Sequence, residues 1–117
     1  MATLLYVEDH PPAQMLLQAI VGEMTSHQLT VASSGAEARE LASQLSPDLY
    51  IVDLDLPDTD GLALIQALKQ IHAAPVLLVS AYAEAVKEAE IKSLVFAYLA
   101  KPLDPDNVAQ TIQRALA

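Results

Sequence analysis

A group of carboxylates directly follows a short apolar run near the middle of the chain. The run extends from Leu49 to Val52, and the acidic residues that follow within eight positions are Asp53, Asp55, Asp58 and Asp60. An apolar run of this length, bounded by turn residues, predicts a buried strand. Asp53 would then lie at the carboxyl end of that strand, and this edge is where open α/β sheets bind their ligands. The sequence therefore places a candidate functional site around Asp53.

A second acidic pair, Glu8–Asp9, ends the first β-prone run of the chain. If the strands before Glu8 and Asp53 are neighbours in a parallel sheet, three carboxylates converge at one edge. Like charges in one pocket are unfavourable unless a cation neutralises them. Oxygen ligands without cysteine favour a hard ion, Mg²⁺ or else Mn²⁺. We therefore expect a magnesium site at Glu8, Asp9 and Asp53 rather than three unrelated turn residues.

A hydroxyl and an ammonium group are expected at the same edge of the sheet. Ser80 ends one predicted strand, and Lys101 follows the next. Hydrogen-bond donors and cations stabilise the charged oxygens of a phosphoryl group, and a carboxylate can act as a nucleophile that forms an acyl phosphate. Taken alone, each residue has an ordinary interpretation, a strand-end hydroxyl and a solvated charge. Their joint placement beside Asp53 favours phosphoryl chemistry.

Strands and helices that alternate along the whole chain would position these residues. The runs predicted as strands are Thr3 to Val7, Leu29 to Ala32, Leu49 to Asp53, Val76 to Val79 and Val95 to Leu99. Helices are predicted from Pro11, from Ser34 and Asp60 as N-caps, over about Ala83 to Lys92, and from Asp104. This alternation predicts a parallel sheet covered on both faces. We expect a flavodoxin-like (βα)5 fold, doubly wound, with strand order 2-1-3-4-5 and a switch point between the first and third strands.

Composition narrows the class of protein. The chain has 117 residues, 53% of them apolar, which suits one domain with a real core. The net charge of −9 is a poor match for a nucleic-acid backbone, so direct nucleic-acid binding is not expected. No apolar run approaches the roughly 18 residues of a membrane span, and the N-terminus lacks the pattern of a secretory signal. With no cysteine in the chain, these features favour a cytoplasmic location without membrane association.

Four separated motifs together make the chain resemble the receiver domain of two-component response regulators. They are the acidic pair Glu8–Asp9, the block from Asp53 to Gly61, the pair Ser80–Ala81, and the run from Tyr98 to Pro102. The resemblance covers residues 1–117, so the chain is expected to be a single receiver domain. Such domains are phosphorylation-activated signalling switches rather than enzymes.

The resemblance implies a role for each acidic residue of the site. Asp53 is expected to accept a phosphoryl group from a phosphohistidine on a sensor histidine kinase or a histidine phosphotransfer protein. Asp9 and Asp53 are expected to bind Mg²⁺ directly, Glu8 through a water molecule, and Asp55 through its backbone carbonyl. Glu8 stands where the family more often has aspartate.

The resemblance also implies how the signal would leave the site. Lys101 contacts the phosphoryl group, Ser80 moves toward it, and Tyr98 turns inward, which changes the surface of the fourth helix, fifth strand and fifth helix. That surface would control an output domain, a partner or a homodimer. The Lys101–Pro102 peptide bond is expected to be cis. Leu94–Val95 departs from the Gly-Ala pair that is frequent before the fifth strand and puts the switch geometry in question.

Two alternatives remain open at this point. One is a pseudo-receiver, a protein-binding scaffold that is never phosphorylated. The other is a phosphatase like the haloacid dehalogenases, because Asp53-Leu54-Asp55 matches their DxD motif. Pro57 stands where that family has threonine or valine, and the chain is short for it. The chain is expected to be either a stand-alone receiver or part of a longer protein.

Overall fold

A computed structural model describes residues 1–56, 60–81 and 89–117 of the chain. Its strands are β1 (Thr3–Val7), β2 (Gln28–Ala32), β3 (Leu49–Asp53), β4 (Val76–Ser80) and β5 (Ala97–Ala100). The helices within the described ranges are α1 (Pro11–Met24), α2 (Gly35–Leu45), α3 (Gly61–Ile71), α4 (Ala89–Leu94) and α5 (Pro105–Leu116). All strand pairs are parallel, and the order is β2-β1-β3-β4-β5. The predicted flavodoxin-like architecture is therefore confirmed.

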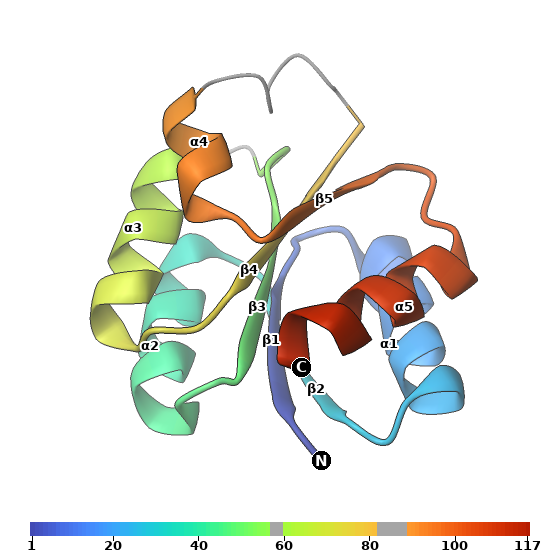
Figure 1. Cartoon of the computed structure of the whole chain (residues 1–117). Coiled ribbons are helices and arrows are strands. Elements are labelled where there is room, and N and C mark those ends of the chain that lie inside the picture. Colours follow the sequence, from blue (N-terminus) through green and yellow to red (C-terminus); the bar gives the residue numbers. More distant parts are fainter. Residues whose placement is uncertain (57–59, 82–88) are drawn as a thin grey trace.

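Helices cover both faces of the sheet. Figure 1 shows α2, α3 and α4 on one side of the strands and α1 and α5 on the other. Successive side chains of a strand point to opposite faces, so Leu5 and Val7 pack with the first group of helices, while Leu4 and Tyr6 pack with the second. Every residue of β3 and β4 is buried, as expected for strands covered on both faces. This double cover fixes the strand ends that carry the site.

Two helices begin at the N-caps that the sequence predicts. The side-chain oxygen of Ser34 accepts a hydrogen bond from the Glu37 amide at 3.1 Å, and the side chain of Asp60 caps α3 in the same way. Such caps satisfy amide groups that have no partner inside the helix. A Cβ atom at Gly61 would overlap the end of the Leu54 side chain, which would then have to shift. The start of α3 is thus fixed beside the chain that leaves β3.

The last strand begins later than the sequence predicts. The apolar run from Val95 predicted a strand over Val95 to Leu99, whereas β5 spans Ala97–Ala100. Val95 packs against the core between the sheet and α2, α3 and α4 without belonging to a strand. The Phe96 amide donates a hydrogen bond to the Val76 carbonyl at 2.8 Å, while its side chain is 51% exposed. The apolar residues at 95 and 96 therefore belong to the segment before β5 and not to the strand.

The helix predicted over Ala83 to Lys92 lies partly outside the described residues. Its described part is α4, which is helical from Ala89 and ends at Leu94, two residues beyond the predicted end. The Lys69 ammonium of α3 donates a hydrogen bond to the Leu94 carbonyl at 3.0 Å and ties the end of α4 to its neighbour.

Among the helices of the described ranges, none is both long and apolar enough to cross a lipid bilayer.

Candidate functional site

The carboxyl ends of four neighbouring strands bring the candidate site residues to one edge of the sheet. Glu8 follows β1, Asp53 ends β3, Ser80 ends β4 and Lys101 follows β5. β1 and β3 are adjacent, yet they lead to helices on opposite faces (Figure 1), so this edge is the topological switch point. The side chains of Glu8, Asp53 and Ser80 are almost fully buried. The fold thus gathers distant residues into one buried polar cluster.

The Lys101 ammonium group lies among three carboxylates. Its Nζ atom donates a hydrogen bond to Asp53 Oδ2 at 2.9 Å, and it lies 3.6 Å from Glu8 Oε1 and 3.7 Å from Asp55 Oδ2. The Lys101–Pro102 peptide bond that follows β5 is cis, as expected. One cation therefore offsets part of the repulsion between three neighbouring acidic side chains.

Burial and hydrogen bonding shift the pKa values of Glu8 and Asp53 in opposite directions. Burial raises the pKa of Glu8 to about 7, and the hydrogen bond and negative charge of Asp53 add to this. Burial also opposes ionisation of Asp53, but hydrogen bonds from Glu8, the Asp55 amide and Lys101 outweigh it and hold the pKa of Asp53 below its usual range. The same carboxylates raise the pKa of Lys101 against the effect of its own burial. Asp53 is therefore kept as the ionised carboxylate, the form that can act as a nucleophile.

The oxygen atoms of the site fit a hard cation in type, but the described residues do not form a ready-made metal cage. Asp9 has an exposed side chain, and its backbone amide donates a hydrogen bond to Glu8 Oε2 at 3.1 Å. In the described ranges, no group of three histidine, aspartate or glutamate residues has an arrangement that could hold a metal ion. The cation that lies beside Glu8 and Asp53 in this structure is the Lys101 ammonium group. Asp58 lies outside the described residues.

Asp55 takes part in the site through its side chain as well as its backbone. Its amide donates a hydrogen bond to Asp53 Oδ1 at 2.9 Å. Its carboxylate accepts hydrogen bonds from the Ser80 hydroxyl at 3.0 Å and from the Ala81 amide at 3.1 Å. The sequence predicted a role for the Asp55 carbonyl only, so these side-chain contacts are a finding of the structure.

The two residues predicted as the switch are in direct contact. The Tyr98 hydroxyl donates a hydrogen bond to the Ser80 backbone carbonyl at 3.0 Å. The Tyr98 side chain is half-buried and packs against the core on the side of α2, α3 and α4. Since Ser80 also contacts Asp55 through its hydroxyl, it connects the acidic cluster to the aromatic ring on β5.

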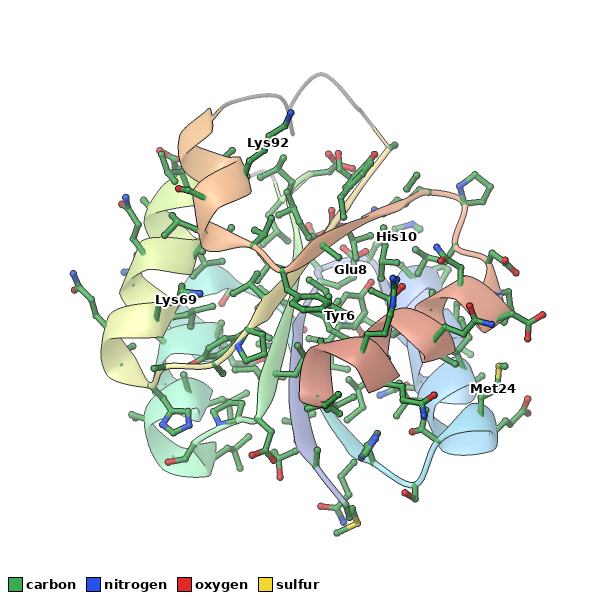
Figure 2. The ribbon with its side chains drawn as sticks, viewed as in Figure 1. Tyr6, Glu8, His10, Met24, Lys69 and Lys92 are labelled. Carbon is green, nitrogen blue, oxygen red and sulfur yellow. The ribbon has the colours of Figure 1, made fainter. Side chains whose placement is uncertain are left out.

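Two residues of the site were not predicted. The buried Tyr6 hydroxyl donates a hydrogen bond to Glu8 Oε1 at 3.3 Å, and Figure 2 shows these two side chains close together at the centre of the molecule. Gln14 of α1 donates hydrogen bonds to the Glu8 carbonyl at 2.6 Å and to the Ser33 hydroxyl at 3.3 Å. Tyr6 was detectable, because residues two apart in a strand share a face. Gln14 carried no such signal, since its position depends on how α1 packs.

Comparison with known proteins places this geometry in a family. The family model described as the response regulator receiver domain matches residues 4–113. The transcriptional regulatory protein ZraR of Escherichia coli is 33% identical over 116 residues, which cover 97% of this chain and 26% of ZraR. The histidine-protein kinase BarA of the same species is 31% identical over 96% of this chain and 12% of BarA. The chain thus spans about a quarter or less of the length of these two relatives.

Solved structures agree with the sequence relatives. The chemotaxis protein CheY4 of Vibrio cholerae is 25% identical, with a TM-score of 0.90 over 99% of both chains. A CheY-like receiver domain from Methylobacillus flagellatus is 27% identical, with a TM-score of 0.90 over 98% of both chains. Together with the family match over nearly the whole chain, these similarities show that the chain belongs to the receiver domains of two-component response regulators.

Proposed function

We propose that this receiver domain is a phosphorylation-controlled switch in which Asp53 is the phosphoryl acceptor. The observation that carries the proposal is the contact between Asp53 Oδ2 and Lys101 Nζ at 2.9 Å, at the switch point of the sheet. An ionised carboxylate that is paired with an ammonium group can attack phosphorus while the cation stabilises the charge that develops on the phosphoryl oxygens. Receiver domains are signalling switches, and in the proposed reaction the phosphoryl group remains on the Asp53 side chain.

The transfer of the phosphoryl group needs only the phosphohistidine, Asp53 and a proton from solvent. A carboxylate oxygen of Asp53 forms a bond to the phosphorus of a phosphohistidine, and the bond between phosphorus and the imidazole nitrogen breaks. The imidazole keeps the electron pair of the broken bond and takes a proton from solvent. Lys101 and the Ser80 hydroxyl then stabilise the charge on the new acyl phosphate by donating hydrogen bonds to its oxygens.

A magnesium ion belongs to this proposal because the site offers only oxygen ligands. Asp9 and Asp53 would bind it directly, Glu8 through water, and Asp55 through its backbone carbonyl. When bound, the ion would neutralise charge on the phosphoryl oxygens and on the carboxylates. Asp9 suits this role because it is exposed and directly follows Glu8 in the sequence.

The proposed partners follow from the names of the relatives. BarA is a histidine-protein kinase and ZraR is a transcriptional regulatory protein. We therefore propose a histidine kinase or a histidine phosphotransfer protein as phosphoryl donor. The signal would leave through the surface of α4, β5 and α5, toward an output domain or a second copy of the chain. Exposed Phe96 and half-buried Tyr98 lie on or beside β5 and support this choice.

Intact mass spectrometry after incubation with acetyl phosphate and Mg²⁺ tests the proposal. We expect one phosphoryl group on the wild-type chain, which hydroxylamine removes because acyl phosphates are labile to it. Asp53→Asn should take up none. Asp104→Asn is the matched control, because Asp104 is exposed and its side chain makes no capping hydrogen bond. Equal labelling of Asp53→Asn would refute the acceptor assignment, and an unlabelled wild-type chain that also ignores beryllofluoride would favour the pseudo-receiver.

The strand order and the family match favour this switch over a phosphatase of the haloacid-dehalogenase type. In that alternative the second aspartate of the DxD motif is an acid or base. Here the carboxylate of Asp55 instead accepts hydrogen bonds from Ser80 and Ala81.

A further inference from the structure

We propose that the Asp55 carboxylate is a resident anion, which in the unphosphorylated protein occupies the donors that a phosphoryl group on Asp53 would use. Phosphorylation would then have to displace the Asp55 side chain. This inference rests on the proposed function of Asp53 and assigns to Asp55 a role as competitor, separate from that of its backbone carbonyl.

Three donors converge on this one carboxylate. Asp55 Oδ1 accepts from the Ser80 hydroxyl at 3.0 Å, and Asp55 Oδ2 accepts from the Ala81 amide at 3.1 Å. Asp55 Oδ2 also lies 3.7 Å from Lys101 Nζ. A hydroxyl, a backbone amide and an ammonium group are the set that stabilises an anionic oxygen group. The donors are thus already engaged by a negative charge before any phosphoryl group arrives.

The Asp55 carboxylate and a phosphoryl group on Asp53 would compete, because two of their shared donors carry only one hydrogen each. The Ser80 hydroxyl and the Ala81 amide each carry one hydrogen, so neither can donate a full hydrogen bond to Asp55 and to a phosphoryl oxygen at once. Lys101 has three hydrogens and can serve both. Competition therefore centres on the strand end of β4, where Ser80 and Ala81 lie, and is weaker at Lys101.

Burial shows which of the two carboxylates can move. The side chain of Asp53 is 3% exposed, whereas that of Asp55 is 23% exposed. A displaced Asp55 carboxylate can therefore regain water, and Asp53 remains fixed by the Asp55 amide and by Lys101. Substituting the Asp55 side chain leaves its backbone carbonyl in place, which separates the competitor role from metal binding.

A double-mutant cycle on the affinity for beryllofluoride, measured at saturating Mg²⁺, tests the competition. The four proteins are wild type, Asp55→Ala, Ser80→Ala and the double variant. Asp55→Ala should bind beryllofluoride roughly tenfold more tightly than wild type, equivalent to about 1.4 kcal/mol. In the Ser80→Ala background the gain should be at least about threefold smaller, because one contested donor is already missing. Equal gains in both backgrounds would show a general charge effect and overturn the inference.

A second measurement needs neither metal nor phosphoryl analogue. In the metal-free protein, the amide proton of Ala81 should shift upfield in NMR spectra of Asp55→Ala, because it loses a charged acceptor. Asp48→Ala is the matched control: Asp48 Oδ2 accepts from the Thr3 amide at 2.8 Å, so that variant should move Thr3 and leave Ala81 unchanged. An unchanged Ala81 signal in Asp55→Ala would contradict the proposed contact.

The beryllofluoride affinities also separate this inference from the proposed function. If no variant binds beryllofluoride, the phosphoryl site at Asp53 is wrong and the competition fails with it. If wild type and Asp55→Ala bind it equally well, the phosphoryl site stands and the role of Asp55 as a resident anion is refuted.

Discussion

The Tyr98 hydroxyl donates a hydrogen bond to the backbone carbonyl of Ser80, and thereby joins two strand positions that are 18 residues apart in the sequence. Ser80 presents its hydroxyl to the acidic cluster on one side and its carbonyl to the aromatic ring on the other. We therefore propose that a change in what Ser80 binds at the cluster reaches the surface around β5 through Ser80 itself. A ligand shifts a two-state equilibrium only by binding the two states differently.

Ser80→Ala should accept a phosphoryl group but fail to transmit the change. A phosphoryl oxygen gives the Ser80 hydroxyl a charge-assisted hydrogen bond only in the modified state. Without that hydroxyl, the NMR shifts of β5 and α5 residues should stay close to those of the unmodified protein after phosphorylation. Ser43→Ala, a change at an exposed serine of α2, should respond as wild type does. Wild-type shift changes in phosphorylated Ser80→Ala would refute the role of Ser80.

Glu8→Gln should alter the dependence of stability on pH in metal-free protein. The pKa of Glu8 rises from 4.5 to about 7 on folding, so between these values the folded state binds the extra proton. Stability from this group is fully present below about pH 4.5 and is lost as pH rises through about 7. Urea denaturation should therefore show a decline over this range in wild type and a flatter profile in Glu8→Gln. Glu40→Gln, at an exposed site on α2, should keep the wild-type profile.

Asp53 contributes in the opposite direction and in a different pH window. Its pKa is held below the usual value of 3.8, so its stabilising contribution is present above that value and is lost as the pH falls below it. The two carboxylates are therefore distinguishable in one titration. Identical profiles for wild type and Glu8→Gln between pH 4.5 and 7 would contradict the assignment of the raised pKa to Glu8.

Asp9→Ala should lose Mg²⁺ affinity with little effect on folding. The Asp9 side chain is exposed, so its removal should change the free energy of unfolding by less than about 0.5 kcal/mol, and any reduction in like-charge repulsion would favour the folded state. Isothermal titration calorimetry with Mg²⁺ measures the first effect and urea denaturation the second. Glu40→Ala serves as a control for the loss of one remote negative charge. Unchanged Mg²⁺ binding by Asp9→Ala would remove Asp9 from the metal site.

The fold was largely predictable because its signals are local and repeated. The apolar run before Asp53 and the caps at Ser34 and Asp60 gave the strand and helix starts that the structure shows. Predicting the start of β5 was harder, because Val95 and Phe96 are as apolar as typical strand residues but lie in the segment that precedes β5. A short apolar run does not show where a strand begins, because the start of pairing depends on the neighbouring strand.

The placement of the candidate site residues at neighbouring strand ends was predictable, but their contacts were not. Four strand ends brought Glu8, Asp53, Ser80 and Lys101 together, as a parallel sheet requires. The direction of the Asp55 side chain was not predictable, because side-chain rotamers depend on donors such as the Ala81 amide that only the folded chain supplies. Sequence spacing places a residue at an edge, and packing decides which way it points.

Tyr50→Phe should destabilise the fold without affecting the site. The buried Tyr50 hydroxyl lies 3.0 Å from the Leu68 carbonyl oxygen and 2.7 Å from the His72 carbonyl oxygen, at the end of α3, and its single hydrogen is shared between these two acceptors. Its removal should lower the free energy of unfolding by about 1–2 kcal/mol, measured by urea denaturation. Beryllofluoride affinity should be unchanged, because Tyr50 contacts the end of α3 rather than the acidic cluster. A loss of stability below about 0.5 kcal/mol would show that water replaces these hydrogen bonds.

Locating the labelled residue after phosphorylation identifies the phosphoryl acceptor. Borohydride reduces an aspartyl phosphate to homoserine, which tandem mass spectrometry identifies by position. After treatment with acetyl phosphate and Mg²⁺, we expect homoserine at position 53 alone, since Asp53 is the ionised carboxylate paired with Lys101. Homoserine at position 9 or 55 with Asp53 intact, or no reduced residue in a chain that carries phosphate, would show that Asp53 is not the acceptor.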